Sequence, residues 1–140
     1  MNYYPETKEI KDVCVLDERS RFWNAPNLTE LVNIIKEQIE EKKGKFIGTL
    51  ESQGIAAIIL ADIAFMCENP KVIENRLYVD VKILETPKGK FLKEMIETTI
   101  PENLSTHFRF VLSGIGTLDE DMSVRDYQAI SVYLSPVTTI

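Results

Sequence analysis

The sequence predicts an α+β fold, in which a mostly antiparallel β-sheet or barrel of about five or more strands carries two main helices. Three observations predict it. Apolar residues recur at helical spacing in residues 27–43 and 85–97, and they alternate at strand spacing in residues 76–84. The remaining apolar segments do not follow the regular strand–helix alternation of a parallel sheet. A chain of 140 residues is long enough for one core, so we expect a single domain over residues 1–140.

The first forty residues are expected to contain an arm, a short strand and a helix. Residues 1–13 are polar and predict a flexible N-terminal arm, and "VCVLD" (13–17) predicts a short strand. Asn27 precedes the first helical apolar residues and Glu30 follows three positions later, which is typical of a helix N-terminus. The helix is expected over 27–43, with Gly44 ending it. Its apolar face consists of Leu28, Leu31, Val32, Ile35 and Ile39.

The middle of the chain predicts three strands and a second helix. "KFIGTL" (45–50) is a short strand, and "IAAIILADIAFM" (55–66) is apolar on both faces, which favours a buried strand. Residues 67–75 are expected to form a hairpin turn before the half-buried strand 76–84. Thr86 is the expected cap of the second helix, with Pro87 in its first turn. The apolar face of this helix is expected to be Phe91, Leu92, Met95 and Ile96.

Two further strands, 105–118 and 126–137, are expected to close the sheet around the acidic turn 119–125.

The net charge of −6 argues against binding to nucleic acid in general, because phosphates require clustered basic residues. No apolar run approaches the length of a membrane span, and the polar N-terminus does not resemble a secretion signal. We therefore expect an intracellular protein with no membrane contact. No Cys/His spacing predicts a metal, and no motif predicts a cofactor.

The chain has one histidine, His107, and Ser105 lies two residues before it. On a strand the two side chains would share a face with their Cα atoms about 6.5–7 Å apart, so they could just meet. A nucleophilic serine also needs an orienting group for the imidazole and an oxyanion hole, and the neighbouring residues supply neither. From these residues alone, a partly exposed strand histidine is favoured over a catalytic pair.

The order of several segments adds a family resemblance. "RSRFW" before the helix resembles the N-x-R-x-Y element of the prohead maturation proteases of tailed bacteriophages. "FIGTLES" is similar to that family's G-E-L-x-H-P strand end, and "RLYVDVKILETPKGK" to its hairpin and I-L-x-T-P-x-G-K turn. "LSGIGTL" resembles the end of its S-S-R-G-x-G-S motif, and "YQAISVYLSPV" its closing strand. The resemblance covers residues 17–137 and implies an assemblin-like fold.

The departures from these motifs concern the residues that do chemistry in the family. At the position of the family's histidine base the chain has Ser52 or Gln53. At the positions of the serine pair, aligned through Gly114 and Gly116, it has Val111 and Leu112. Neither aliphatic side chain can attack a carbonyl group, and neither serine nor glutamine is a base at neutral pH. The resemblance therefore implies a protease-like core in which the catalytic positions are degenerate.

The resulting hypothesis is a chain without enzymatic activity that has a structural or assembly role in a phage head. Its implied partners are capsid, scaffold or portal proteins, and a homo-oligomer is compatible with this role. Its implied location is the virion, or the host cytoplasm during assembly. Two alternatives remain open. One is an active prohead serine protease that uses Ser105 and His107, and the other is a small α+β interaction domain unrelated to phage assembly.

Overall fold

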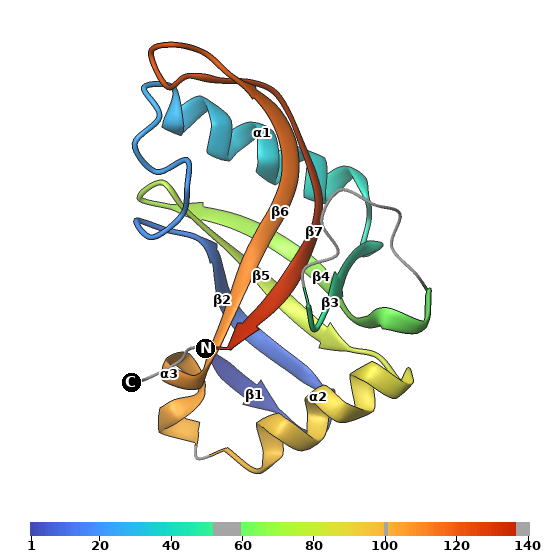
Figure 1. The fold of residues 1–140 in the computed structure, drawn as a ribbon. Coiled ribbons are helices and arrows are strands. Elements are labelled where there is room, and N and C mark those ends of the chain that lie inside the picture. The colour runs from blue at the N-terminus through green and yellow to red at the C-terminus, as the bar shows by residue number, and fades with distance from the viewer. Residues whose placement is uncertain (52–59, 100, 137–140) are drawn as a thin grey trace.

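Seven strands form one sheet in this computed structural model, which describes residues 1–51, 60–99 and 101–136. The spatial order is β1-β2-β5-β4-β3-β7-β6 (Figure 1). All neighbours are antiparallel except β3 and β7, which pair in parallel. The strands are β1 (Asn2–Tyr4), β2 (Glu9–Leu16), β3 (Phe46–Thr49), β4 (Ile63–Ile73), β5 (Arg76–Ile83), β6 (Phe108–Leu118) and β7 (Val124–Pro136). With the helices α1 (Leu28–Glu41), α2 (Pro87–Glu97) and α3 (Leu104–His107), they confirm the predicted α+β class.

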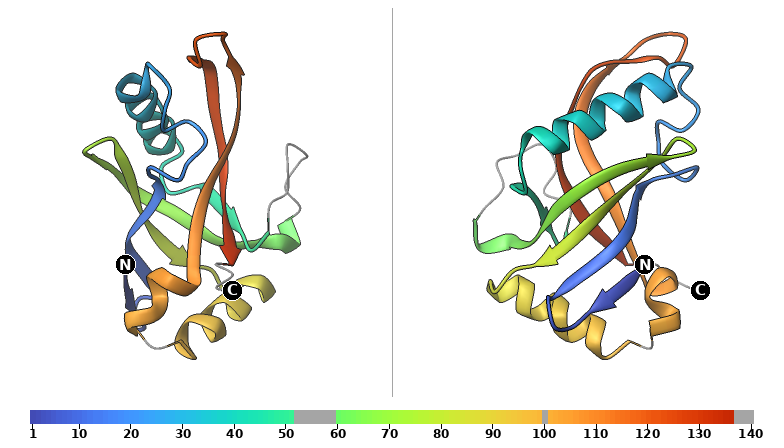
Figure 2. Two further views of the ribbon diagram at one scale, coloured as in Figure 1. Left: turned by 60° about the vertical axis from the view of Figure 1, so that its left-hand side comes forward. Right: turned by 180° about the vertical axis from the view of Figure 1, so that it is seen from behind.

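The sheet curls, so that its second strand approaches its last. β2 and β6 lie in contact, yet no ladder pairing joins them among the described residues. Figure 2 shows the long β6–β7 hairpin rising beside α1, on one side of the curved sheet. Because β6 is at the end of the strand order, its outer edge faces a seam rather than another described strand.

The N-terminus does not form the expected arm. β1 pairs with β2, and β2 pairs with β5 along its length, in place of the short strand expected at 13–17. Ile10 and Val13 are fully buried against the core. Lys11 and Asp12, between them, are exposed, and a register shift at this point lets Ile10 and Val13 both face the core although they are three residues apart.

The first helix confirms the predicted apolar face, but its N-terminus differs from the prediction. Leu31, Val32, Ile35 and Ile39 are buried, and α1 packs on β4, β5 and β7. Asn27 occupies the cap position without making a capping hydrogen bond from its side chain. Its amide instead contacts Val124 of β7, so tertiary contacts override the local capping preference.

The fourth strand is displaced from the segment predicted for it. Residues 55–59 of the expected strand 55–66 lie outside the described residues, and a 3₁₀ turn at Leu60–Asp62 precedes β4. β4 then continues to Ile73, through residues that were expected to form a turn. A register shift between Glu68 and Lys71 accommodates Pro70 in the strand. The hairpin turn itself is only Glu74 and Asn75, both at positive φ.

The second helix begins as predicted. The Thr86 hydroxyl accepts a hydrogen bond from the Gly89 amide, and Pro87 occupies the first turn. Leu92 and Ile96 are buried, whereas Phe91 is 55% exposed, so the expected apolar face is narrower than four residues. None of the helices within residues 1–51, 60–99 and 101–136 is long and apolar enough to cross a membrane.

The core lies between the sheet and α1, and its largest buried side chains include Phe46, Phe65 and Phe110. The rings of Phe65 and Phe110 meet edge to face at 5.3 Å, which joins β4 to β6 across the curl. Gly48 faces Phe65 in the ladder, and a Cβ atom at that position would overlap the phenyl ring. The glycine of "FIGTLES" therefore has a packing role in this chain.

Candidate functional site

Both residues aligned with the family's serine pair lie on β6. Val111 pairs with Tyr133 of β7, and Leu112 pairs with Val132. Successive residues of a strand point to opposite faces, and Leu112 is the one that packs against the core. Ser52 and Gln53, the residues aligned with the histidine base, lie outside the described residues.

The alternative pair, Ser105 and His107, does not lie on a strand. Both residues belong to the short helix α3, at the far end of the sheet from α1 (Figure 1). Residues two apart on a helix point in widely different directions, so this helix does not bring the imidazole to the hydroxyl. Both side chains are exposed. The expected strand geometry for this pair is therefore wrong.

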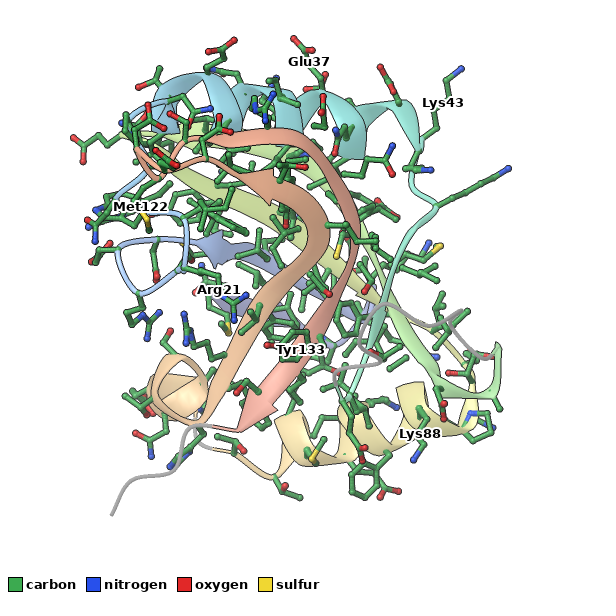
Figure 3. The ribbon with its side chains drawn as sticks, turned by 45° about the horizontal axis from the view of Figure 1, so that its top comes forward. Arg21, Glu37, Lys43, Lys88, Met122 and Tyr133 are labelled. Carbon is green, nitrogen blue, oxygen red and sulfur yellow. The ribbon has the colours of Figure 1, made fainter. Side chains whose placement is uncertain are left out.

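A cleft of about 510 Å³ opens at the seam between β2 and β6. One wall is formed by β6 and β7, and the other by the end of β2 and the loop that follows it. Arg21 of this loop and Tyr133 of β7, both labelled in Figure 3, line the cleft. Its other polar lining residues are Arg19, Ser20, Arg109, Ser113, Tyr127 and Ser135. The outer edge of β6 therefore borders a polar cavity.

The loop wall of the cleft is fixed by Asp17, a buried carboxylate. Asp17 accepts hydrogen bonds from the backbone amide of Arg19 and from its guanidinium group, at 2.9 Å and 2.6 Å. The Ser20 hydroxyl accepts from the Asp17 amide, so the turn is closed from both ends. Burial raises the pKa of Asp17, but the hydrogen bonds and charge of Arg19, with the charge of Arg109, outweigh it and hold the pKa below its usual value.

The cleft is rich in positive charge, although the chain as a whole is acidic. Arg19, Arg21 and Arg109 all line it. Arg19 is paired with Asp17, whereas none of the ion pairs among the described residues includes Arg21 or Arg109. A chain of net charge −6 therefore presents, in one cavity, two guanidinium groups that no described carboxylate pairs with. Guanidinium groups bind carboxylates with two parallel hydrogen bonds, so this wall suits an acidic ligand.

Tyr127 lies at the inner end of the cleft. Only 4% of this residue is exposed, and its ring meets that of Phe22 edge to face at 5.1 Å. A Cβ atom on Gly114 would lie 2.5 Å from the Tyr127 hydroxyl, so the phenol group rests directly on the glycine backbone. Burial raises the pKa of Tyr127 to about 12, and the hydroxyl is therefore protonated at neutral pH.

Two amide side chains, Asn27 immediately before α1 and Gln38 within it, hold β7 in place behind the cleft. The Gln38 amide nitrogen donates to the Tyr127 carbonyl at 2.6 Å, and its oxygen accepts from the Ala129 amide at 2.8 Å. Asn27 makes the corresponding pair of bonds to the backbone of Val124, at 2.8 Å and 3.4 Å. Each side chain thus satisfies one backbone donor and one backbone acceptor of β7, as a neighbouring strand would. Together they fix the segment that carries Tyr127.

The arrangement supplies hydrogen-bond donors and positive charge for a bound chain. Ser20, Ser113 and Ser135 add hydroxyl groups, and the seam exposes the edge of β6. Across the part of the chain that the structure describes, no cluster of three or more His, Cys, Asp or Glu residues could hold a metal ion. The free thiol of Cys67 is fully buried, and burial raises its pKa.

Comparison with known proteins identifies the fold. No family model matches the chain, and no curated protein matches it. A solved structure does: the capsid assembly protease gp21 of bacteriophage T4, with a TM-score of 0.56 and 15% sequence identity over 94% of this chain and 92% of that one. The chain has the fold of a phage capsid assembly protease. At this identity the match shows the fold, and it agrees with the resemblance of residues 17–137 to prohead proteases.

The match corrects one expectation. The chain was expected to have no enzymatic activity, because Val111 and Leu112 stand at the positions of the serine pair. The solved structure with this fold belongs to an enzyme, so that expectation is contradicted.

The residues of the cleft were not predicted from the sequence. "RSRFW" resembles a family element, but nothing in that motif indicates that Arg19 and Arg21 line one cavity with Arg109, some ninety residues later. The composition could not reveal this, since the clustered charges are far apart in the chain. The one local signal was the pair of arginines immediately before an aromatic residue.

Proposed function

We propose that this chain acts in the assembly of a bacteriophage head, where it binds an extended segment of a capsid, scaffold or portal protein in the cleft at the β2–β6 seam. The observation that carries the proposal is the fold match to a capsid assembly protease over nearly the whole of both chains. The protein would act in the host cytoplasm during assembly, or within the virion.

The edge of β6 suits an extended ligand. A chain laid along it could add a strand to the sheet through backbone hydrogen bonds, while its side chains enter the cleft. Arg21 and Arg109 favour a segment that carries carboxylates. The overall charge of −6 repels an acidic segment from most of the surface. The arginines therefore make the cleft the favoured place for such a segment to bind.

Cleavage of the bound segment is a second candidate function. The solved structure that shares this fold is a protease, which favours cleavage. A substrate would lie along the edge of β6, as a bound assembly partner would. Ser20, Ser113 and Ser135 are the cleft hydroxyl groups to test as nucleophiles. If a head protein is cut, the alanine variant of the responsible serine should still bind it but leave it intact.

Both functions can be tested with the capsid, scaffold and portal proteins of the genome that encodes this chain. Overlapping peptides covering the capsid, scaffold and portal proteins are titrated against the purified protein, and the peptides are analysed by mass spectrometry after incubation. We expect at least one acidic peptide to bind. Arg109→Glu should weaken its binding about tenfold or more, since one attractive charge becomes repulsive.

The matched control is Arg125→Glu, which changes the same charge on the β6–β7 hairpin, where Arg125 pairs with Asp119 outside the cleft. This variant should bind almost as the unchanged protein does. If no head-protein peptide is bound or cut, the proposed function is wrong.

A further inference from the structure

The tip of the β6–β7 hairpin, residues 119–123, presents two carboxylates that no described cation pairs with. Asp119 has an ion-pair partner within the hairpin, whereas none of the ion pairs in the described part of the chain includes Glu120 or Asp121. The Ser123 amide donates a hydrogen bond to the Asp121 carboxylate, which holds the pKa of Asp121 below its usual value. Both carboxylates are exposed, so the tip is a negatively charged projection.

The same end of the hairpin also exposes large apolar side chains. Leu118 is 57% exposed, and Met122, labelled in Figure 3, is 51% exposed. Ile115 on the same strand is exposed as well. Apolar side chains grouped among polar ones are typical of protein contact sites. Backbone hydrogen bonds between Asp119 and Met122 and between Asp119 and Ser123 close the turn, so the tip loses little conformational freedom when it binds.

The cleft at the β2–β6 seam has the complementary charge. Arg21 and Arg109 line it, and the described carboxylates leave both guanidinium groups unpaired. Phe22 and Val111 add apolar surface to the lining. The volume of about 510 Å³ falls in the range of roughly 300–1,000 Å³ that is usual for pockets holding small ligands. The cleft therefore admits the side chains of a turn but not a folded domain.

The tip cannot reach Arg109 of its own chain. β6 has 11 residues, with Arg109 near its start and the tip after its end. A strand rises about 3.3 Å per residue, so the two lie roughly 30 Å apart. Figure 1 shows the tip beside α1 and the start of β6 beside α3, at opposite ends of the molecule. A tip that binds at Arg109 must therefore come from another copy.

We propose that the acidic hairpin tip of one copy of this chain binds in the β2–β6 seam cleft of a second copy. Glu120 and Asp121 accept hydrogen bonds from Arg21 and Arg109, and Met122 contacts the apolar part of the lining. Because the tip and the cleft are different surfaces, each bound pair keeps one of each free. Copies therefore add head to tail, into a closed ring or an open filament.

This inference goes beyond the proposed function and does not depend on it. A seated tip occupies the cleft in which we place the head-protein segment, so the two ligands should compete. Self-association would then keep the cleft covered until a head protein displaces the neighbouring copy.

Sedimentation velocity of the purified protein, from micromolar to millimolar concentration, tests the contact. The average mass should exceed that of one chain and rise with concentration. Arg109→Glu should weaken this self-association about tenfold or more, because it reverses a charge in the cleft. A tip variant with Glu120→Gln and Asp121→Asn should do the same, since it removes both free carboxylates. Its Asp121→Asn change keeps an oxygen that can accept from the Ser123 amide, so the turn is preserved.

The matched control removes two carboxylates elsewhere. Glu37→Gln with Glu41→Gln changes the exposed face of α1, where Figure 3 labels Glu37, and neither residue has an ion-pair partner in the ranges that the structure covers. It should associate as the unchanged protein does. Thermal unfolding of every variant shows that each is folded, and we expect melting temperatures close to that of the unchanged protein.

Mixing the two impaired variants distinguishes this contact from a symmetric one. The Arg109→Glu copy keeps its tip, and the copy with the altered tip keeps its cleft. One tip and one cleft remain functional in the mixture, so it should form a complex of two chains and nothing larger. Each variant alone should stay monomeric at the same concentration.

Three outcomes would overturn the inference. The unchanged protein could remain monomeric at millimolar concentration, the two variants could associate as strongly as it does, or the mixture could fail to form the complex of two chains. The head-protein peptides judge the proposed function separately. A monomeric protein that binds such a peptide contradicts only this inference, and a self-associating protein that neither binds nor cuts one contradicts only the proposed function.

Discussion

Asp17 is the residue on which the shape of the cleft wall depends most directly. Its carboxylate is buried and bound by Arg19, so it orders the turn that presents the loop arginines. Its pKa lies below the ordinary value of about 3.9. A carboxyl group with a lowered pKa stabilises the folded state above its unfolded pKa and loses that contribution as the pH falls through its folded pKa.

We therefore expect Asp17→Asn to lower the free energy of unfolding by roughly 2 kcal/mol at pH 7, where a charge-assisted hydrogen bond is lost. The difference between the two proteins should shrink below pH 4 and vanish once Asp17 is protonated in the folded state. Urea unfolding at pH 7 and pH 3 measures it. Glu120→Gln, at an exposed turn position, is the control and should change stability by less than about 0.5 kcal/mol.

Gly114 is the second residue with a clear constraint. A Cβ atom there would lie within 2.6 Å of the Tyr127 ring carbon that carries the oxygen, and it would also overlap the backbone of β7. Gly114→Ala should therefore destabilise the protein by about 1–3 kcal/mol, because neither the clamped tyrosine nor the ladder can move away. At Gly116 the nearest atoms lie 3.1 Å away, so Gly116→Ala should cost less. Equal melting temperatures for the two variants would contradict this account.

Among the elements, the contact between α1 and β7 depends on side-chain amides. Gln38 occupies a backbone donor and a backbone acceptor of β7. Gln38→Ala would leave both groups partly buried and without a partner, so we expect a loss of about 1–3 kcal/mol in denaturant unfolding. Asn33→Ala is the matched control. The Asn33 amide bonds only to Thr29 on the exposed side of the same helix, and its loss should cost less than about 0.5 kcal/mol.

The elements also show what periodicity could and could not predict. The strand Arg76–Ile83 and the helix Pro87–Glu97 were found because their alternation and their Thr86–Pro87 start are local signals. β4 was placed too early, because an apolar run does not reveal which of its residues will pair with a neighbour. α3 was read as a strand because four residues are too few for a helical period to appear.

The site was less predictable than the fold for a related reason. The local motif around Gly114 and Gly116 was recognised, and it does border the cleft. The cleft places Arg19 opposite β6, and Gln38 bonds to β7, across ninety residues or so of sequence. The spacing of residues within one segment cannot predict contacts between segments that are far apart in the sequence. Only the curled sheet brings these residues together.

At the scale of the whole molecule, the N-terminal segment is part of the sheet. β2 lies between β1 and β5, and Ile10 and Val13 are buried in the core. Deletion of residues 1–13 should prevent folding, because it removes this burial and exposes the edge of β5. Deletion of residues 1–5 removes only the edge strand β1 and should leave a folded protein with a lower melting temperature. A native circular-dichroism spectrum after the longer deletion would contradict this expectation.

The two edge strands of the sheet, β6 and β1, should differ in how a bound segment affects them. In an antiparallel strand, amide groups point alternately to the two neighbours, so β6 has one set of amides bonded to β7 and another facing the seam. Hydrogen exchange at residues 109–113 should therefore alternate between slow and fast in the free protein. If a head-protein segment adds to this edge, it should slow the fast set and leave β1, the opposite edge, unchanged. Protection confined to the loop arginines, with the amides of β6 unaffected, would show that the segment binds by charge without extending the sheet.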